Sequence, residues 1–403
     1  MKKTLIVCGQ YPSPENAGSS IRTMNFVRFF KERGIVDLAY TEGTKRLELD
    51  GETFRKEYPL KKIDYPAHFG ARTSMLLKGF PYPICQYEPG SEAVLLSAIE
   101  RNDYQYVLVR YAVNSSWLFR REARHTARVI VDLDDLISES LYETYFDPTS
   151  RPDKRLIRAI NRRLLKQYEK KCARFGASIF CSETDLHKIA RHRQNNNAFV
   201  VPNVYPSESF FRHDFGDGFL NPNRLLFVGT LSHAPNVTGL MWFVDEVYPH
   251  LQRKYPDAGL LIVGQSPNEA ARSIQQKCSN IELRANVPNL KPFYEDCKAV
   301  VVPLLAGGGT RIKILEAALA NRPILSTPKG AEGLDLQDGV HLHLFRSGHE
   351  FIEKYEQLNK TSAYHSMVEN ARKLVLNKYT TDGFNEAMSR VVAHIDEAKS
   401  YLV

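Results

Sequence analysis

One segment, VVVPLLAGGGTRIKILEA at residues 300–317, joins an apolar run to three glycines and then to an amphipathic helix. The valines predict a buried strand, and Gly307, Gly308 and Gly309 predict a turn directly after it. Thr310 then has the side chain of a helix N-cap. Glycines let a ligand approach the backbone, and the N–H groups at a helix start attract phosphate. The order of strand, glycine turn and helix therefore predicts an α/β sheet with a phosphate site at one strand end.

Charged residues after the glycines favour a ligand that carries both phosphate and ribose. Arg311 and Lys313 place two cations in the first helical turn, where they oppose the helix dipole unless an anion lies beside them. Glu316 lies further along, where a carboxylate can accept hydrogen bonds from ribose hydroxyls. The alternative is a glycine turn before a surface helix with Glu316 merely exposed, and the glycines alone favour it. The combination of glycines, cations and carboxylate favours the nucleotide site.

Short apolar runs alternate with helix-length amphipathic stretches along the whole chain, which is typical of parallel α/β sheets. At 403 residues the chain is long for one core, so two domains are expected. Turn-forming residues cluster between 202 and 223, and a second set of strands and helices follows them. We predict two doubly wound, Rossmann-like α/β domains, 1–208 and 209–380, facing a central ligand-binding cleft. The stretch 381–403 is either an ordinary terminal helix or one that packs back on the first domain.

Composition argues against several other classes of protein. The six cysteines form no CxxC pair, and the twelve histidines show no ligand spacing, so neither a disulfide framework nor a metal site is expected. The first apolar run is too short for a signal peptide. No window approaches the roughly 20 apolar residues of a membrane-spanning helix. We expect a cytoplasmic protein with no metal ion.

The net charge of +8 is concentrated in residues 151–175, which contain ten basic and two acidic residues. Apolar residues recur there at helical spacing, so one face of a helix is expected to pack inward. These residues are Ile157, Ile160, Leu164, Tyr168 and Cys172. The basic face is either solvated or bound to an anionic membrane surface or a lipid-linked diphosphate. Each basic residue near anionic lipid contributes roughly 1 kcal/mol.

The chain resembles the family-4 glycosyltransferases, which are retaining, metal-independent enzymes of the GT-B fold. The resemblance is most specific in residues 307–334, which look like the donor-binding region of that family. Gly229 and Thr230, in the run LFVGT, resemble the loop that opens the second domain. Gly18, in the run GSSIR, resembles the glycine loop near the donor phosphates. The resemblance covers nearly the whole chain and is loosest in residues 41–105, where acceptor recognition usually varies.

The resemblance implies an enzyme that moves a sugar from a UDP- or GDP-linked donor to a glycan or lipid-linked acceptor. Many relatives build bacterial surface polysaccharides in this way, with the acceptor on the first domain and the donor on the second. Residues 307–310 with Arg311 and Lys313 would hold the diphosphate as it leaves. Glu316 would bind the ribose, and Gly18 would let the first domain close on the donor. The nucleotide sugar is a co-substrate, so no other cofactor is implied.

Two positions depart from the pattern of the family. Relatives usually carry glutamates at both ends of an E-x7-E motif, of which Glu316 matches the second and Gly308 replaces the first. A subset with a GGGTR-type loop shares this change. Asp134 stands where a histidine often faces the sugar, so it becomes the candidate for that place. The alternative is that Asp134 and Asp135 only end a strand and cap a helix.

Many relatives also carry an arginine and a lysine in the loop that corresponds to residues 229–236, where this chain has neither. Arg311 and Lys313 are then the cations beside the glycine loop, so they join Asp134 as the candidate catalytic residues. Arg311 is expected to contact the phosphates directly, because a guanidinium makes forked contacts to phosphate.

Three other functions remain open. A non-hydrolysing nucleotide-sugar epimerase has the same architecture but needs no acceptor. A glycosyltransferase-like binding subunit without activity would explain why both usual catalytic positions differ. A nucleic-acid-binding protein would explain the basic helix, although the chain has no recognisable reader motif.

Overall fold

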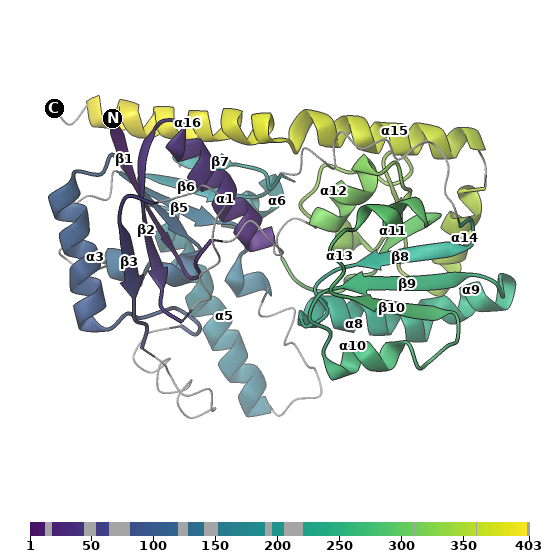
Figure 1. Cartoon of the computed structure of the whole chain (residues 1–403). Coiled ribbons are helices and arrows are strands. Elements are labelled where there is room, and N and C mark those ends of the chain that lie inside the picture. The colour runs from purple at the N-terminus through teal and green to yellow at the C-terminus, as the bar shows by residue number, and fades with distance from the viewer. Residues whose placement is uncertain are drawn as a thin grey trace. The chain divides into compact units, whose positions relative to one another are not determined.

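The computed structural model describes residues 1–12, 18–43, 54–63, 81–119, 128–140, 152–189, 196–204, 221–308, 311–359 and 361–400. The chain divides into two compact units, each built around one parallel sheet (Figure 1). Unit 1 comprises Met1–Asn203 and Thr381–Val403, and unit 2 comprises Val204–Thr380. The predicted boundary at residue 208 lies outside the described residues.

Unit 1 contains a seven-stranded parallel sheet in the order β3-β2-β1-β4-β5-β6-β7. The strands are β1 (Lys2–Cys8), β2 (Gly34–Thr41), β3 (Glu57–Leu60), β4 (Tyr106–Arg110), β5 (Val129–Leu133), β6 (Ala177–Phe180) and β7 (Ala198–Val200). The α-helices include α1 (Gly18–Lys31), α3 (Pro89–Asn102), α5 (Pro152–Cys172), α6 (Glu183–Ile189) and α16 (Thr381–Ser400). The consecutive residues Leu5, Ile6 and Val7 of β1 are all fully buried, so this strand is covered on both faces.

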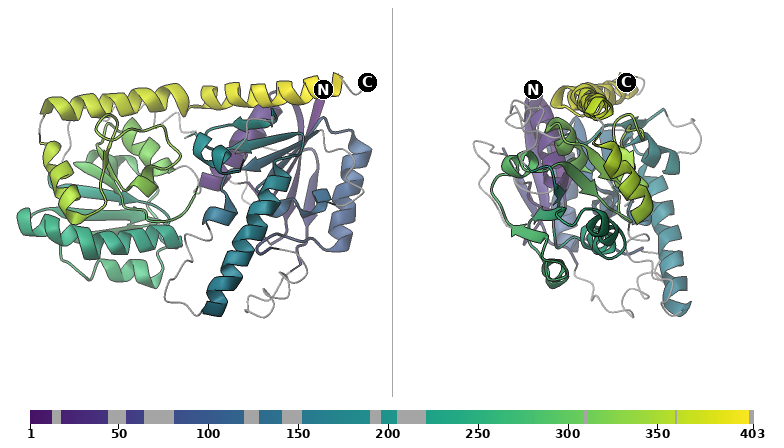
Figure 2. Two further views of the ribbon diagram at one scale, coloured as in Figure 1. Left: turned by 180° about the vertical axis from the view of Figure 1, so that it is seen from behind. Right: turned by 90° about the vertical axis from the view of Figure 1, so that its right-hand side faces the viewer.

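Unit 2, in green in Figure 2, contains a parallel sheet. The sheet has six strands in the order β10-β9-β8-β11-β12-β13. The strands are β8 (Arg224–Val228), β9 (Gly259–Gly264), β10 (Ile281–Ala285), β11 (Ala299–Val302), β12 (Ile324–Ser326) and β13 (His343–Leu344). The α-helices are α8 (Ala234–Trp242), α9 (Tyr248–Lys254), α10 (Glu269–Ile274), α11 (Lys291–Glu295), α12 (Ile312–Leu319), α13 (Pro328–Ala331), α14 (Gly348–Gln357) and α15 (Thr361–Lys378). A π-helical turn, Phe243–Val247, joins α8 to α9.

Helices cover both faces of the sheet in unit 2, and β8 shows why. Leu225 and Phe227 pack into a core that contains residues of α8 and α9. Leu226 and Val228 point to the opposite face and pack into a core that contains residues of α12 and α15. Successive side chains of a strand alternate between faces, so an unbroken apolar run implies burial on both sides. The predicted class of two doubly wound α/β domains is confirmed.

The strand order reverses beside the first strand of each sheet, between β1 and β4 and between β8 and β11. Such a reversal leaves a crevice outside the carboxyl ends of the two strands, because the following helices lie on opposite faces. In unit 2, α8 follows β8 on one face and α12 follows β11 on the other. The loop from Gly229 and the loop from Pro303 therefore leave neighbouring strand ends.

The terminal helix α16 belongs to unit 1 and packs against α1, β6 and β7. The rings of Phe26 and Phe384 meet edge to face with centroids 5.2 Å apart. Asp396 accepts a 2.7 Å hydrogen bond from Lys2 Nζ and a 2.8 Å bond from the hydroxyl of Tyr106. Among the helices that the structure describes, none has the length and apolar character needed to cross a membrane.

Candidate functional site

The loop after β8 and the first turn of α12 meet at Gly229. A Cβ at Gly229 would lie 2.9 Å from Asn236 Nδ2 and 2.9 Å from Lys313 Nζ, so glycine leaves the room that both side chains occupy. Asn236 Nδ2 donates to the carbonyl oxygen of Thr230 at 2.9 Å, and its Oδ1 accepts from Lys313 Nζ at 2.9 Å. The structure therefore brings the predicted residues Gly229, Thr230 and Lys313 together and adds Asn236, which was not among the predicted site residues.

Lys313 has a buried side-chain amine. Its exposed fraction is 9%, and its Nζ lies 4.4 Å from the centroid of the Phe227 ring. Burial, with a smaller contribution from the charge of Arg311, lowers the pKa of Lys313 to about 7, against the opposing effect of Glu316. A buried charge gains strongly from a counter-ion. The surroundings of Lys313 therefore favour an anionic ligand.

The helix after the glycine loop begins one residue later than the sequence suggested. Its first residue is Ile312, and Arg311 occupies the N-cap position with φ −83° and ψ 87°. The prediction that Thr310 is the N-cap is therefore wrong, and Gly309 and Thr310 themselves lie outside the described residues. The backbone of Arg311 is non-helical, as is usual for an N-cap residue.

The guanidinium of Arg311 holds the glycine loop. Nη2 donates to the carbonyl oxygen of Gly307 at 2.7 Å, and Nη1 donates to that of Gly308. Gly307 has φ +99°, a left-handed conformation that favours glycine, and a Cβ there would lie 3.3 Å from Pro235. Arg311 therefore positions the loop and also contributes a positive charge beside Lys313.

Glu316 is buried, so the alternative of a surface helix with Glu316 merely exposed is wrong. Its exposed fraction is 5%, and its Oε2 accepts a 2.7 Å hydrogen bond from the hydroxyl of Tyr294. The physical reason is that α12 is buried from Lys313 to Leu319, with α15 packed against it. The role of Glu316 toward a ribose stays a prediction, and it now concerns a carboxylate that already has a protein partner.

His233 is a member of the cluster that the sequence did not reveal. It occupies the N-cap position of α8, in the loop that contains Gly229. The ring is exposed, yet partial desolvation lowers its pKa, and the charges of Lys313 and Arg311 lower it further. His233 is therefore neutral near pH 7. The sequence signal that could have identified His233 as a site residue was its place in the loop after the first strand of the second sheet.

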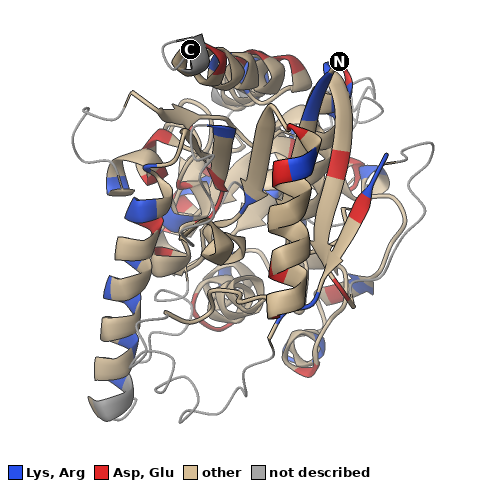
Figure 3. Ribbon diagram, turned by 90° about the vertical axis from the view of Figure 1, so that its left-hand side faces the viewer, with Lys and Arg blue, Asp and Glu red and all other residues tan. Residues whose placement is uncertain are grey.

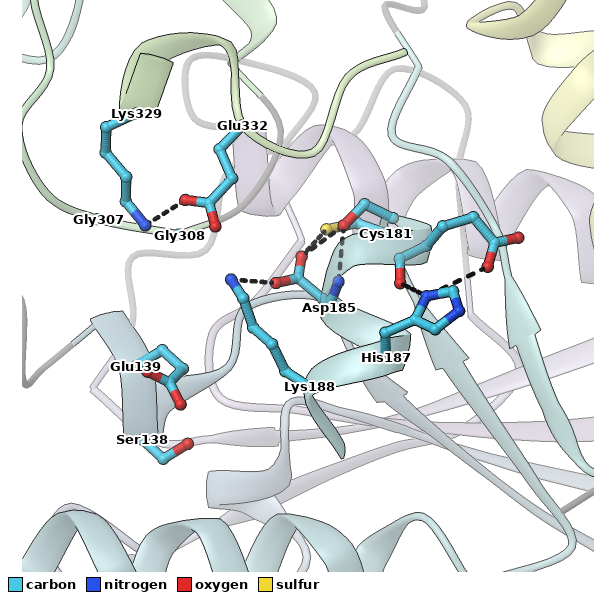
Figure 4. Close-up of polar contacts among 12 residues, drawn as sticks. Ser138, Glu139, Cys181, Asp185, His187, Lys188, Gly307, Gly308, Lys329 and Glu332 are labelled. Atoms are coloured by element: carbon cyan, nitrogen blue, oxygen red, sulfur yellow. Dashed lines mark hydrogen bonds and ion pairs between the residues drawn. The ribbon is translucent and has the colours of Figure 1, made fainter. Parts of the chain in front are cut away.

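The start of α13 packs against the end of β11, which precedes the glycine loop. The Thr327 side chain caps this helix by accepting from Gly330 N at 3.0 Å. A Cβ at Gly330 would lie 2.5 Å from the carbonyl oxygen of Val302, so this helix approaches the strand closely. Lys329 and Glu332 form an ion pair, as Figure 4 shows. A second helix start therefore lies at the same strand end.

In unit 1, Asp134 follows β5 and belongs to a buried network of charges. Its Oδ1 accepts from Asn203 Nδ2 at 2.7 Å, and its Oδ2 accepts from the Tyr111 hydroxyl at 3.2 Å. Arg22 Nε lies 3.6 Å from Oδ1, and Arg110 Nη2 lies 3.4 Å from Oδ2. Burial opposes ionisation, but the two guanidinium groups outweigh it and lower the pKa of Asp134. Asp134 is thus an ionised carboxylate at a strand end.

Arg22 ties the first helix to this network. Its Nε and Nη2 donate to the two carboxylate oxygens of Asp132 at 3.1 and 2.8 Å, and its Nη1 donates to the carbonyl oxygen of Val201 at 2.9 Å. Gly18 is the first residue of α1, and residues 13–17 before it lie outside the described residues. The role of Gly18 near donor phosphates stays a prediction.

The basic segment forms α5, whose first turns expose apolar side chains. Leu156 is 62% and Ile160 is 44% exposed, so the prediction that Ile160 packs inward is wrong. The buried residues of α5 lie toward its C-terminal end, at Leu165, Glu169 and Cys172. Figure 3 shows the positions of Lys and Arg, in blue, along the ribbon of this helix. Exposed apolar and basic residues therefore share the first half of α5.

Comparisons with known proteins find glycosyltransferases. Residues 222–360 match a family with the description "Glycosyl transferases group 1". An uncharacterized 44.6 kDa protein in the cps region of Klebsiella pneumoniae is 24% identical over 355 residues, which are 85% of this chain and 87% of that protein.

Solved structures with the same fold include sucrose-phosphate synthase from Thermosynechococcus elongatus. That structure is 12% identical, with a TM-score of 0.69 over 98% of this chain and 100% of that one. S. aureus TarM, in a complex with fondaparinux, alpha-GlcNAc-glycerol and UDP, is 13% identical, with a TM-score of 0.65 over 97% and 100%. The chain has the GT-B fold, as predicted. Together with the group 1 match, this fold supports a glycosyltransferase.

Proposed function

We propose that the protein transfers a sugar from a nucleoside diphosphate sugar, held by unit 2, to an acceptor held by unit 1. The observation that carries this proposal is the cluster of Gly229, Asn236, Arg311 and Lys313 at the reversal of strand order in unit 2. Two cations beside glycine loops at strand ends suit a diphosphate. The group 1 match covers the same residues.

The chemistry that these residues supply is stabilisation of the leaving diphosphate. Negative charge develops on the diphosphate as the bond to the sugar breaks, and fixed positive groups stabilise that charge without reorganising. Lys313 and Arg311 supply the charge in this proposal. The backbone N–H groups of Gly307, Gly308 and Thr230 add to it in this proposal. No metal ion is required for this step. Glu316 is proposed to accept a hydrogen bond from the ribose.

Asp134 is the proposed catalytic residue of unit 1. Its carboxylate is ionised, and its neighbours Arg22 and Arg110 keep it so. We propose that this negative charge lies toward the sugar and offsets the positive charge of the transition state. The carboxylate that relatives place at the position of Gly308 is absent here.

The finer assignment rests on the resemblance and on what related proteins bind. We propose a family-4 enzyme of the subset with a GGGTR-type loop, which retains the configuration of the sugar. The UDP in the TarM complex supports a UDP-linked donor, and GDP is the alternative. The relative from a cps region supports a role in bacterial surface polysaccharide synthesis, with a glycan or lipid-linked acceptor.

A transfer assay tests the proposed function. Purified protein is incubated with UDP- and GDP-sugars, with and without lipid-linked glycans, and the released nucleoside diphosphate and the sugar products are measured. Release that depends on acceptor supports a transferase, whereas an epimeric nucleotide sugar formed without acceptor identifies an epimerase. Binding without any reaction identifies an inert subunit. Activity that persists with EDTA and falls about 10- to 150-fold in Arg311→Ala supports the metal-independent site.

We also propose that α5 binds the anionic inner face of the plasma membrane, where a lipid-linked acceptor would lie. Arg163, Lys170 and Lys171 are exposed on this helix, and Leu156 and Ile160 expose apolar surface near its start. Basic residues attract anionic lipid, and exposed apolar side chains beside them enter the headgroup boundary.

Flotation with liposomes tests the membrane contact. The parent should bind phosphatidylserine-containing vesicles at low salt and lose them at high salt, and it should not bind neutral vesicles. Leu156→Ser with Ile160→Ser should weaken binding. Val94→Ser on α3, where Val94 is 50% exposed, is the matched control and should not. Equal binding to both vesicle types, or binding to neither, would mean that the basic face of α5 is only solvated.

A further inference from the structure

Lys313 places an ammonium group where a charge is poorly compensated. The side chain is 9% exposed, and its hydrogen-bond partner among the described residues is the neutral amide oxygen of Asn236, at 2.9 Å. The other close group is the ring of Phe227. A lysine ammonium has three donors, so one amide oxygen satisfies only part of it. The geometry therefore favours the neutral amine as long as no anion is bound.

The charged neighbours of Lys313 strengthen this preference. Arg311 contributes a permanent positive charge from the same end of α12. His233, from the loop after β8, is neutral and adds no counter-charge. Among the described residues, Glu316 is the acidic group that raises the pKa of Lys313, and one of its oxygens accepts from the Tyr294 hydroxyl. Burial and Arg311 outweigh Glu316, so the pKa of Lys313 falls to about 7.

We propose that Lys313 lacks its proton in the empty site on the alkaline side of neutrality and gains one from solvent when a nucleoside diphosphate binds. Asn236 is the positioning residue that holds the amine beside Gly229. The nitrogen of Lys313 gains the proton, and the buffer acid loses it. This inference rests on the proposed function, because it names the diphosphate as the anion. A neutral nucleoside supplies no charge to drive the protonation of Lys313. Lys313 and Asn236 therefore discriminate in favour of the diphosphate.

Calorimetry measures the proton directly. UDP and GDP are titrated into the full-length protein at pH 7.0 and pH 8.5, each in two buffers of different ionisation enthalpy. The second phosphate pKa is about 6, so the nucleotide itself is fully ionised at the higher pH. At pH 8.5 the parent should take up about one proton for each nucleotide bound, and its affinity should fall about tenfold per pH unit above neutrality. Binding at pH 8.5 without proton uptake would overturn the inference.

Two variants test whether the proton taken up on nucleotide binding goes to Lys313. Lys313→Arg keeps a charge that is never lost, so uptake should disappear and affinity should not change between pH 7.0 and 8.5. Asn236→Asp puts a carboxylate against the amine and should hold the proton in the empty site, so uptake should also disappear although the lysine remains. If Asn236 had a purely structural role, proton uptake in Asn236→Asp would be the same as in the parent. Uptake that persists in either variant would overturn the inference.

The ligand-free protein supplies a readout that does not depend on the proposed function. The pKa of Lys313 is lower in the folded chain than the usual 10.5, so the unfolded chain binds more protons between about pH 7 and pH 10.5. Parent stability should therefore rise with pH across this window, and Lys313→Met should lack this rise. If the stability of the parent and of Lys313→Met depends on pH in the same way, the inference that Lys313 is neutral in the empty site is refuted. If neither nucleotide binds at pH 7.0, the proposed function and the diphosphate contact fail together, whatever the state of the lysine.

Discussion

Gly229→Ala tests whether the contact between Asn236 and Lys313 matters for nucleotide binding. The new Cβ would lie 2.9 Å from both Asn236 Nδ2 and Lys313 Nζ, a distance that real Cβ atoms essentially never show. The nearest atoms are ends of side chains, so Lys313 moves away and the fold persists. The lost interaction is a hydrogen bond from a charged group when nucleotide is bound, which contributes about 1.5–3 kcal/mol. UDP or GDP affinity should therefore fall about 10- to 150-fold.

The assay is calorimetric titration at pH 7.0, with thermal unfolding to show that the variant is folded. Gly259→Ala is the matched control, because a Cβ there would meet only the carbonyl oxygen of Asn280, at an ordinary 3.6 Å. Adding Gly229→Ala to Lys313→Ala should cost little further affinity, since both changes remove the same contact. The reasoning would be refuted if folded Gly229→Ala bound nucleotide with parental affinity. It would also be refuted if the binding free energies lost in Gly229→Ala and in Lys313→Ala added in full in the double variant.

Three further predictions concern the other candidate residues. Arg311→Ala should slow sugar transfer about 10- to 150-fold through loss of a charge-assisted bond, and Arg311→Lys should recover only part, because lysine lacks the fork that holds the glycine loop. Steady-state rates that match the parent in both would place the phosphate site elsewhere. Glu316→Ala should lower the free energy of unfolding by about 1–3 kcal/mol, because it leaves the buried Tyr294 hydroxyl without its acceptor. Glu316→Gln keeps an acceptor and should unfold close to the parent, whereas unchanged nucleotide affinity in folded Glu316→Ala would remove the ribose assignment. Asp134→Asn should reduce turnover under saturating donor more than Asp135→Asn does, and full turnover would exclude a catalytic role. The pKa of Asp134 is lowered, so its contribution to stability is present at neutral pH and is lost as the pH falls through the folded pKa. The stability difference between parent and Asp134→Asn should accordingly shrink in acid, as denaturant unfolding can show.

Local patterns in the sequence determined the architecture and one half of the candidate site. Apolar runs such as Leu5–Val7 and Leu225–Val228 form strands that are buried on both faces, and that burial is already visible in their composition. The glycine loop could be identified because strand, glycines and helix are contiguous in the chain. Arg311 contacts Gly307 and Gly308, which are its near neighbours in sequence. Such contacts depend on backbone geometry over a few residues.

Tertiary structure decided which distant residues complete the site and which side chains face solvent. Asn236 and Lys313 are 77 residues apart, and they meet because β8 and β11 are adjacent and send their loops to the same sheet edge. Helical spacing could not show that α15 covers α12 and buries Glu316, or that α5 leaves Ile160 exposed where it extends beyond the core. Periodicity specifies that a helix has an apolar face. The order of strands, and the elements that pack on a given helix, specify what that face and the remaining residues touch.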